Sequence, residues 1–268
     1  MSAERPVHVV LIPSYNTGAR LFETIAQIRE LGRPIIVVID GSTDGTAEAL
    51  VSMAESDPTL LACVMPINQG KGGAVLQGLC LAHARGFTHA LTMDADGQHS
   101  TAHVGKMIAT SLAHPEAMVL GVPMFDESAP RIRIFGHKVS NFFAALMTSR
   151  GGIGDALFGF RVYPIVPLIE AFASTSGMRR FDFDSEAVIR LCWRGIRPIN
   201  VATPVRYFRH DEGGVSHFKY VRDNLLLVAM YGRLVAERLG KLRGARIMAA
   251  GIAAGSASVH RGSVDSET

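Results

Sequence analysis

The first half of the chain alternates short apolar runs with segments in which apolar residues recur every three or four positions. The runs have the length of strands, and the spacing between them is that of amphipathic helices. Strands alternating with helices of this length form βαβ units and a mainly parallel sheet. This alternation therefore predicts an α/β fold. The strand-like runs are residues 7–12, 35–39, 60–65, 89–93 and 118–121.

Three polar segments directly follow predicted strands. They are residues 13–16, 40–45 and 94–96. Right-handed crossovers place the loops after parallel strands along one rim of the sheet. Open α/β sheets bind their ligands at that rim. We therefore expect the three segments to form one site.

The segment Asp94-Ala95-Asp96 carries two carboxylates one residue apart at the end of a predicted strand. Hard divalent cations such as Mg²⁺ and Mn²⁺ prefer oxygen ligands of this kind, and a cation bound in this way commonly carries the phosphates of a nucleotide substrate. A solvated turn is the other interpretation of the segment taken alone, because Asp and Gly are common turn residues.

Composition and charge limit the size of the fold and the kinds of partner and compartment that the chain is expected to have. The 268 residues are 48% hydrophobic, which is enough for one large domain or for one domain with an appendage. A formal charge of +3 gives no argument for nucleic acid as a partner. The three cysteines form no Cys-x-x-Cys pair, so we expect reduced thiols. Reduced thiols indicate a cytoplasmic protein. We expect no signal peptide, because residues 1–10 have no apolar core, and no membrane span, because no stretch approaches the ~20 apolar residues that a span needs.

Four segments together carry a family resemblance. In chain order they are Ile12-Pro13-Ser14-Tyr15-Asn16, the turn at Asp40-Gly41-Ser42, Asn68-Gln69-Gly70-Lys71-Gly72-Gly73-Ala74, and the Asp-x-Asp loop. The set closely resembles family 2 glycosyltransferases of the GT-A fold, over roughly residues 7 to 218. The pattern Asp-Ala-Asp-x-Gln at residues 94–98 is similar to that of polyprenyl-phosphate sugar synthases, the dolichyl-phosphate mannose synthase type.

This resemblance implies an inverting, metal-dependent transfer of a sugar from a UDP- or GDP-linked donor to a lipid-linked acceptor, most often a polyprenyl phosphate. It implies that Asp94, Asp96 and Gln98 hold Mg²⁺ or Mn²⁺ at the donor diphosphate. A metal there neutralises charge on the departing nucleoside diphosphate. The residues that the resemblance assigns to the donor are Pro13, Tyr15, Asn16, Asp40, Lys71 and Asp94, with Arg206, Ser216 and His217 from a loop that closes over it.

The resemblance also indicates which residues contact the sugar acceptor or take part in the reaction with it. Arg161 ends a Gly-Phe-Arg segment in which the arginine faces phosphate, and guanidinium suits phosphate through its paired donors. Asp184 and Glu186 open a predicted helix, where either one acts as a general base or organises the acceptor pocket. The other interpretation is helix capping, with Asp184 as the cap. The resemblance thus names Asp96, Asp184, Glu186 and Arg161 as catalytic.

The chain departs from the family pattern at three positions. Ile39 stands where a second acidic residue is usual, and Thr17 stands where an acidic residue usually follows Tyr-Asn. These two changes weaken any inference about the nucleobase. Phe158 replaces the usual Ser before Gly-Phe-Arg, which weakens the inference about the acceptor.

The sequence does not decide whether the acceptor group is a phosphate or a hydroxyl. A lipid phosphate brings an anionic oxygen and needs little help from a base, whereas a hydroxyl of a glycolipid or other lipid makes Asp184 or Glu186 essential. A non-catalytic sugar-nucleotide-binding protein is a further alternative. An NAD-dependent oxidoreductase is disfavoured because no Gly-x-Gly-x-x-Gly follows the first strand. A P-loop NTPase is disfavoured because no Ser or Thr follows Lys71.

Residues 131–150 combine apolar residues at helical spacing with basic residues beside them. Such a stripe either packs on the core or lies in a membrane interface, where basic residues meet anionic head groups. The second interpretation gives peripheral binding to the cytoplasmic face of a membrane. For the chain as a whole we expect a GT-A domain over residues 1–218, a helical extension over 219–255 and a disordered tail over 256–268.

Overall fold

The computed structural model describes residues 7–125, 129–149, 151–205 and 222–240. The chain divides into two compact units, with the boundary between Leu227 and Val228. Residues 222–240 are helical, within the extension that the sequence predicts. The predicted domain boundary at residue 218 and the predicted tail at 256–268 lie outside the described residues and stay predictions.

The first unit is built on a sheet that has seven strands within the described residues, in the order β3-β2-β1-β4-β6-β5-β7. The strands are β1 (His8–Ser14), β2 (Ile35–Asp40), β3 (Leu60–Met65), β4 (His89–Thr92), β5 (Met118–Met124), β6 (Arg161–Pro164) and β7 (Pro198–Pro204). β2 is parallel to β1 and β3, and β4 is parallel to β1. β6 is antiparallel to both β4 and β5, whereas β5 and β7 are parallel. The predicted α/β class is confirmed.

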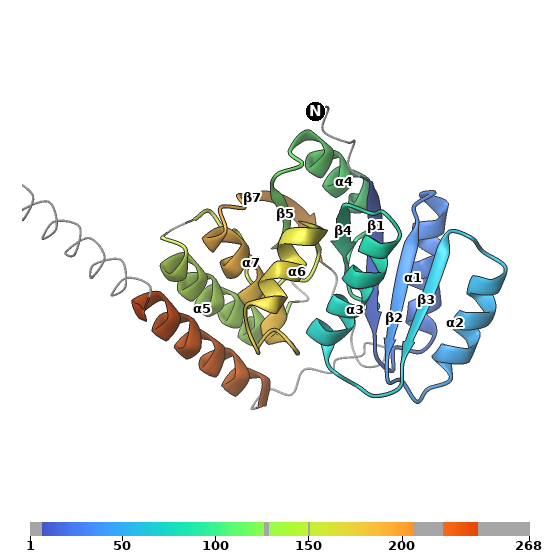
Figure 1. The fold of residues 1–268 in the computed structure, drawn as a ribbon, viewed down its shortest axis with the longest axis horizontal. Coiled ribbons are helices and arrows are strands. Elements are labelled where there is room, and N and C mark those ends of the chain that lie inside the picture. The colour runs from blue at the N-terminus through green and yellow to red at the C-terminus, as the bar shows by residue number, and fades with distance from the viewer. Residues whose placement is uncertain (1–6, 126–128, 150, 206–221, 241–268) are drawn as a thin grey trace, which may run out of the picture. The chain divides into compact units, whose positions relative to one another are not determined.

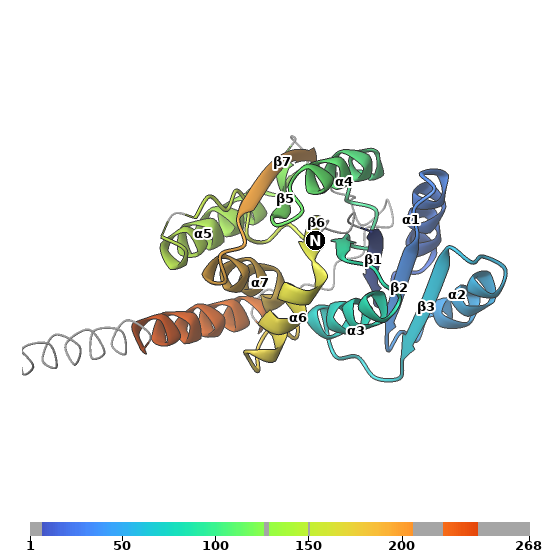
Figure 2. The same cartoon turned by 45° about the horizontal axis from the view of Figure 1, so that its top comes forward.

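Helices cover both faces of this sheet (Figures 1 and 2). On one face, Leu21 of α1, Leu50 of α2 and Met107 of α4 share a core with the strands. On the other face, α3 packs on β1 and β2 and contacts α6 and α7. The helices are α1 (Ala19–Glu30), α2 (Thr46–Glu55), α3 (Lys71–Ala84), α4 (Val104–Ala113), α5 (Arg131–Met147), α6 (Ile165–Ala173) and α7 (Asp182–Trp193), with a 3₁₀ turn η1 (Thr101–His103) before α4.

The sheet places the polar loops on one rim, as the sequence predicts. β1 lies between β2 and β4, and all three run in the same direction. Their carboxyl ends therefore meet at one edge. The three predicted segments lie at these ends. Segment 13–16 covers the last two residues of β1 and the start of the loop after it, segment 40–45 begins with the last residue of β2, and segment 94–96 lies in the loop after β4.

The second half of the sheet contains elements that the sequence analysis did not predict. Arg161 and its neighbours form the short antiparallel strand β6, and residues 165–173 form α6. Pro164 is both the last residue of β6 and the N-cap of α6, and its extended backbone suits the residue before a helix. None of the helices in the described ranges combines the length and the apolar character that crossing a bilayer requires.

Candidate active site

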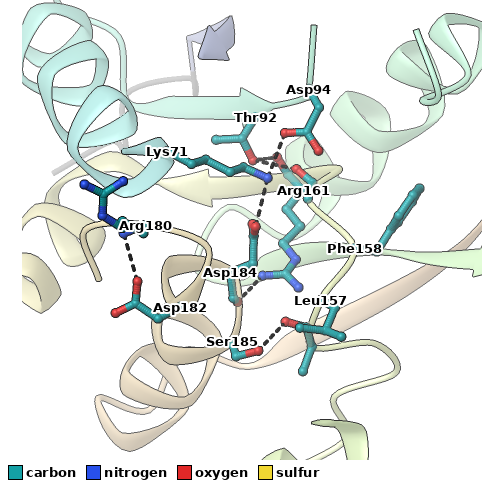
Figure 3. Close-up of polar contacts among 12 residues, drawn as sticks. Lys71, Thr92, Asp94, Leu157, Phe158, Arg161, Arg180, Asp182, Asp184 and Ser185 are labelled. Carbon is teal, nitrogen blue, oxygen red and sulfur yellow. Dashed lines mark hydrogen bonds and ion pairs between the residues drawn. The ribbon is translucent and has the colours of Figure 1, made fainter. Parts of the chain in front are cut away.

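Lys71 joins three elements at the rim. It is the first residue of α3, and its Nζ lies 2.7 Å from Oδ1 of Asp94 and 2.8 Å from Oδ2 of Asp184 (Figure 3). Asp94 follows β4, and Asp184 lies in the first turn of α7. Burial alone would lower the pKa of the Lys71 ammonium, but the charges of Asp184 and Asp94 raise it above its usual value. The ammonium is a fixed positive charge between two carboxylates.

Asp96 lies two residues from Asp94 and is half-buried. Its Oδ1 accepts a hydrogen bond from the backbone N–H of Gln98, at 3.0 Å. Burial, together with the negative charge of Asp94, raises the pKa of the Asp96 carboxyl to about 7. The raised pKa shows that a second negative charge next to Asp94 is unfavourable in this loop, and a cation bound between the two carboxyl groups would relieve that repulsion.

This donor set fits a hard divalent cation. Asp94, Asp96 and Gln98 supply carboxylate and amide oxygens, the ligands that Mg²⁺ and Mn²⁺ prefer. Within the described residues, no group of three or more His, Cys, Asp or Glu side chains is placed to hold a metal. A cation at this loop would therefore rest on the two carboxylates, the Gln98 amide and oxygens from a substrate.

His99 is a buried residue that holds the Asp-x-Asp loop in place. The backbone N–H of Asp94 donates to its Nδ1 at 3.0 Å, and its ring packs edge-on against Phe158. Burial lowers the pKa of the His99 imidazole to about 4. A neutral imidazole is the form that accepts this hydrogen bond, so His99 fixes the backbone at the start of the Asp-x-Asp loop.

Asp40 holds the neighbouring loop together. Its carboxylate accepts hydrogen bonds from the backbone N–H groups of Gln69 and Gly70, at 2.7 and 2.8 Å. Its exposed fraction is only 2%, and this burial raises the pKa of the carboxyl. The structure thus gives Asp40 a role in shaping the loop before Lys71, and its contact with a donor stays a prediction.

The loop after β1 is tied to the loop after β2. Asn16 has a positive φ of 47°, which asparagine tolerates. Its Oδ1 accepts from the backbone N–H of Thr43, and its own N–H donates to Oγ of Ser42. Tyr15 and Asn16 are half-buried at the rim, whereas Pro13 is a buried residue of β1. A donor would meet Tyr15 and Asn16 before Pro13.

The structure does not support Arg161 as a phosphate clamp. The residue is fully buried, and its guanidinium donates to the hydroxyl of Tyr163 and to the backbone carbonyl of Asp155. It also donates to the backbone carbonyl of Asp184 (Figure 3). Arg161 is the first residue of β6, and its guanidinium points toward the start of α7. It thereby fixes the backbone that presents Asp184.

The two acidic residues of α7 have separate roles. The helix begins at Asp182, so the prediction that Asp184 is its cap is wrong. Asp182 instead accepts from the backbone N–H groups of Met178 and Arg180. Glu186 is fully buried, and its Oε1 accepts from Nε of Arg190 at 2.7 Å and from Thr175. A base that takes a proton from a substrate needs access to it, which Glu186 does not have here.

The structure thus gathers Lys71, Asp94, Asp96 and Asp184 at one end of the sheet, with Arg161 behind them. Arg206, Ser216 and His217 lie outside the described residues. Sequence reasoning missed the ion pair between Lys71 and Asp184, which are 113 residues apart. It also missed Thr92, whose hydroxyl donates to the carbonyl of Gly159. Neither contact leaves a local pattern in the sequence.

Comparison with known proteins identifies relatives of the chain. Residues 9–170 match the sequence profile of glycosyl transferase family 2. The chain is 27% identical over 247 residues to polyprenol monophosphomannose synthase of Mycolicibacterium smegmatis, an alignment that covers 88% of this chain and 90% of that one. It is 31% identical over 245 residues to a dolichyl-phosphate beta-glucosyltransferase of Trichomonas vaginalis, covering 83% and 71%.

A solved structure shares the fold. Glucosyl-3-phosphoglycerate synthase of Mycobacterium tuberculosis, in complex with Mn²⁺, UDP-glucose and phosphoglyceric acid, superposes with a TM-score of 0.58. The match covers 88% of this chain and 79% of that one, at 19% identity. The likeness confirms the predicted GT-A architecture.

Proposed function

Because the chain belongs to glycosyl transferase family 2 and is a glycosyltransferase, we propose that it moves a sugar, with inversion, from a nucleoside diphosphate sugar to a lipid-linked phosphate. The observation that carries the proposal is the cluster of Lys71, Asp94 and Asp96 at the carboxyl end of β4. Two carboxylates and one fixed ammonium suit a diphosphate that binds together with a divalent cation.

On the donor side, Asp94, Asp96 and Gln98 would hold Mg²⁺ or Mn²⁺. When bound there, the cation neutralises negative charge on the departing nucleoside diphosphate. Lys71 adds a positive charge that the chain itself supplies, held in place by Asp184. Tyr15 and Asn16 line the rim where the nucleoside would lie, and Asp40 keeps the loop before Lys71 in shape.

The geometry favours a phosphate acceptor over a hydroxyl. Of the two residues expected to act as a base, Glu186 is fully buried and paired with Arg190. Asp184 forms an ion pair with Lys71, and its side chain is 5% exposed. A phosphate oxygen is already anionic and attacks the sugar carbon without losing a proton to the protein. The polyprenol and dolichyl-phosphate enzymes among the relatives support the same acceptor class.

Thermal unfolding in the presence of sugar nucleotides tests the donor assignment. A ligand that binds only the folded state at 100 times its Kd is expected to raise Tm by about 5–10 °C. We expect that rise with a UDP- or GDP-sugar plus Mn²⁺, and a much smaller one with either component alone. Turnover is then measured with a polyprenyl phosphate and with the matching polyprenol. No Tm shift and no transfer with any of these donors would contradict the proposal, and transfer only to the polyprenol would overturn the phosphate acceptor.

A lipid acceptor requires the enzyme to reach a bilayer, and α5 carries a surface suited to this. Apart from Met147, which is buried, the predicted stripe on this helix does not pack on the core. Ile132, Phe135, Val139, Phe142 and Leu146 are all exposed, with Phe135 and Phe142 each at 66%. We call these five residues the apolar stripe. Arg131 and Lys138 of the same helix are also exposed. Apolar side chains beside basic ones fit an anionic membrane surface.

Replacing Phe135 and Phe142 together by Ser is expected to weaken binding to vesicles that contain an anionic phospholipid by at least about tenfold, because each Phe contributes apolar area. Co-sedimentation measures this binding. The matched control replaces by Ser two exposed apolar residues outside α5, Leu31 at the end of α1 and Val51 of α2, and is expected to bind like the wild type. Equal binding by the Phe variant and the control would contradict the assignment of the apolar stripe to the membrane.

A further inference from the structure

Gly159 lies beside the carboxylate of Asp94, just beyond the paired ends of β4 and β6. In the antiparallel pairing of β4 and β6, Thr92 is the partner of Arg161. Gly159 and Asp94 each lie two residues beyond this pair, past the ends of the strands, where the two segments stay close to each other. The hydroxyl of Thr92 donates to the carbonyl of Gly159 at 3.1 Å, which holds the two segments together (Figure 3).

The space beside Gly159 is occupied by the ion pair. A Cβ atom at this position would lie 2.5 Å from Nζ of Lys71 and 3.1 Å from Oδ2 of Asp94. Gly159 is not among the glycines with positive φ. Its backbone conformation is therefore open to other residues, so the close approach of Lys71 is what requires a glycine here.

The neighbouring glycines differ in what obstructs them. A Cβ at Gly70 or Gly72 would meet backbone atoms of Arg179 or Met178. Backbone atoms yield only if a whole segment moves. At Gly159 the nearest atom is the tip of a flexible lysine side chain. An added methyl group there displaces the ammonium and leaves the fold in place.

We propose that Gly159 is a positioning residue for Lys71: its missing side chain leaves the recess in which the ammonium bridges Asp94 and Asp184. The inference rests on the proposed function, which makes this ammonium the fixed cation beside the donor diphosphate. Asp184 fixes the ammonium from the buried side, with 5% of its side chain exposed. Asp94, at 33%, is the partner on the side open to solvent. Without the recess, the ammonium cannot bridge both carboxylates.

A double-mutant cycle separates this role from a general effect on β6. The variants are Gly159→Ala, Lys71→Met and the two combined. Met keeps the apolar stem of the lysine and removes the ammonium. We measure Tm without ligand, and kcat and KM for transfer from the sugar nucleotide that the thermal screen identifies.

Gly159→Ala alone is expected to lower kcat about ten- to a hundredfold, because a charge displaced by about 1 Å costs that much. It is expected to lower Tm by about 2–4 °C. In the Lys71→Met background, the same change is expected to alter neither quantity. The matched control is Gly105→Ala, at an exposed position of α4 where a Cβ meets nothing within 4 Å. It is expected to keep the kcat of the wild type.

Three results would overturn the proposal. They are a wild-type kcat and Tm in Gly159→Ala, an equal loss in both backgrounds, and an unfolded Gly159→Ala protein. The last would show that the methyl group meets the fold and not the lysine tip. If the wild type transfers no sugar, the proposed function fails. The Tm values of the four proteins still test Gly159 in that case, because they need no substrate.

Discussion

Replacing Asp96 by Asn is expected to lower kcat for sugar transfer about 10²- to 10³-fold, the usual loss when one electrostatic contact to developing charge is removed. Asn keeps the size of the side chain and an oxygen that accepts from the backbone N–H of Gln98. It removes the negative charge that a divalent cation requires. Steady-state kinetics with saturating donor and Mn²⁺ measure the effect.

The same substitution is expected to leave Tm without metal unchanged or slightly higher. Burial and the charge of Asp94 raise the pKa of Asp96 to about 7, so the neutral Asn relieves a repulsion. A chelator is expected to reduce wild-type turnover to the level of the variant and to cause no further loss in the variant. Asp57→Asn, which changes a carboxylate on the loop before β3, is the control. If Asp96→Asn retained most of its turnover, the assignment of the metal site would be wrong.

Replacing Arg190 by Met is expected to lower the free energy of unfolding by about 3–5 kcal/mol, because it leaves the Glu186 carboxylate buried without its ion-pair partner. Glu186 is fully buried and Arg190 is 2% exposed, with 2.7 Å between Nε and Oε1. The guanidinium also lies over the ring of Trp193, 6.0 Å from its centroid. Urea unfolding monitored by circular dichroism measures the change.

The control breaks an ion pair of similar spacing on the surface. Arg20 and Glu23 of α1 lie 2.9 Å apart, but Glu23 is more than half exposed. Arg20→Met is expected to cost only about 0.2–1 kcal/mol. Changing Glu186 to Leu together with Arg190→Met is expected to regain part of the stability, since no buried charge is left unpaired.

This pair also tests the role of Glu186. If Glu186 only stabilises α7, Glu186→Gln loses stability and keeps kcat per folded molecule. If it is a general base, kcat falls by orders of magnitude while stability changes little. We expect the first outcome, and the second would restore the assignment made from the sequence.

Local sequence patterns predicted the first half of the fold well, because each strand and helix there has its own signal. β1 to β4 are continuous apolar runs, and the helices between them show helical spacing. The loops at the rim follow from the direction of parallel strands. The position of the Asp-x-Asp loop at the end of β4 was therefore predictable from residues 89–96 alone.

The second half was less predictable because its features depend on distant contacts. Arg161 was assigned to phosphate from a local motif, yet the carbonyl of Asp184, 23 residues away, accepts from its guanidinium. The periodicity of α5 was predicted, but periodicity does not say which side faces the core. In the structure Ser140, Ala144 and Met147 are the buried residues, and the apolar stripe is exposed.

The ion pairs of Lys71 with Asp94 and Asp184 determine when, during translation, the site can form. The ammonium belongs to the N-terminal βαβ segment, and its deeper partner is added 113 residues later. A nascent chain that has folded β1 to β4 has Asp94 and Lys71 but lacks the carboxylate that holds the lysine in place. The site is complete only after the residues of α7 have been translated and have folded onto this segment. A nascent chain that ends before α7 therefore carries the residues assigned to the donor without the arrangement that the proposed reaction needs.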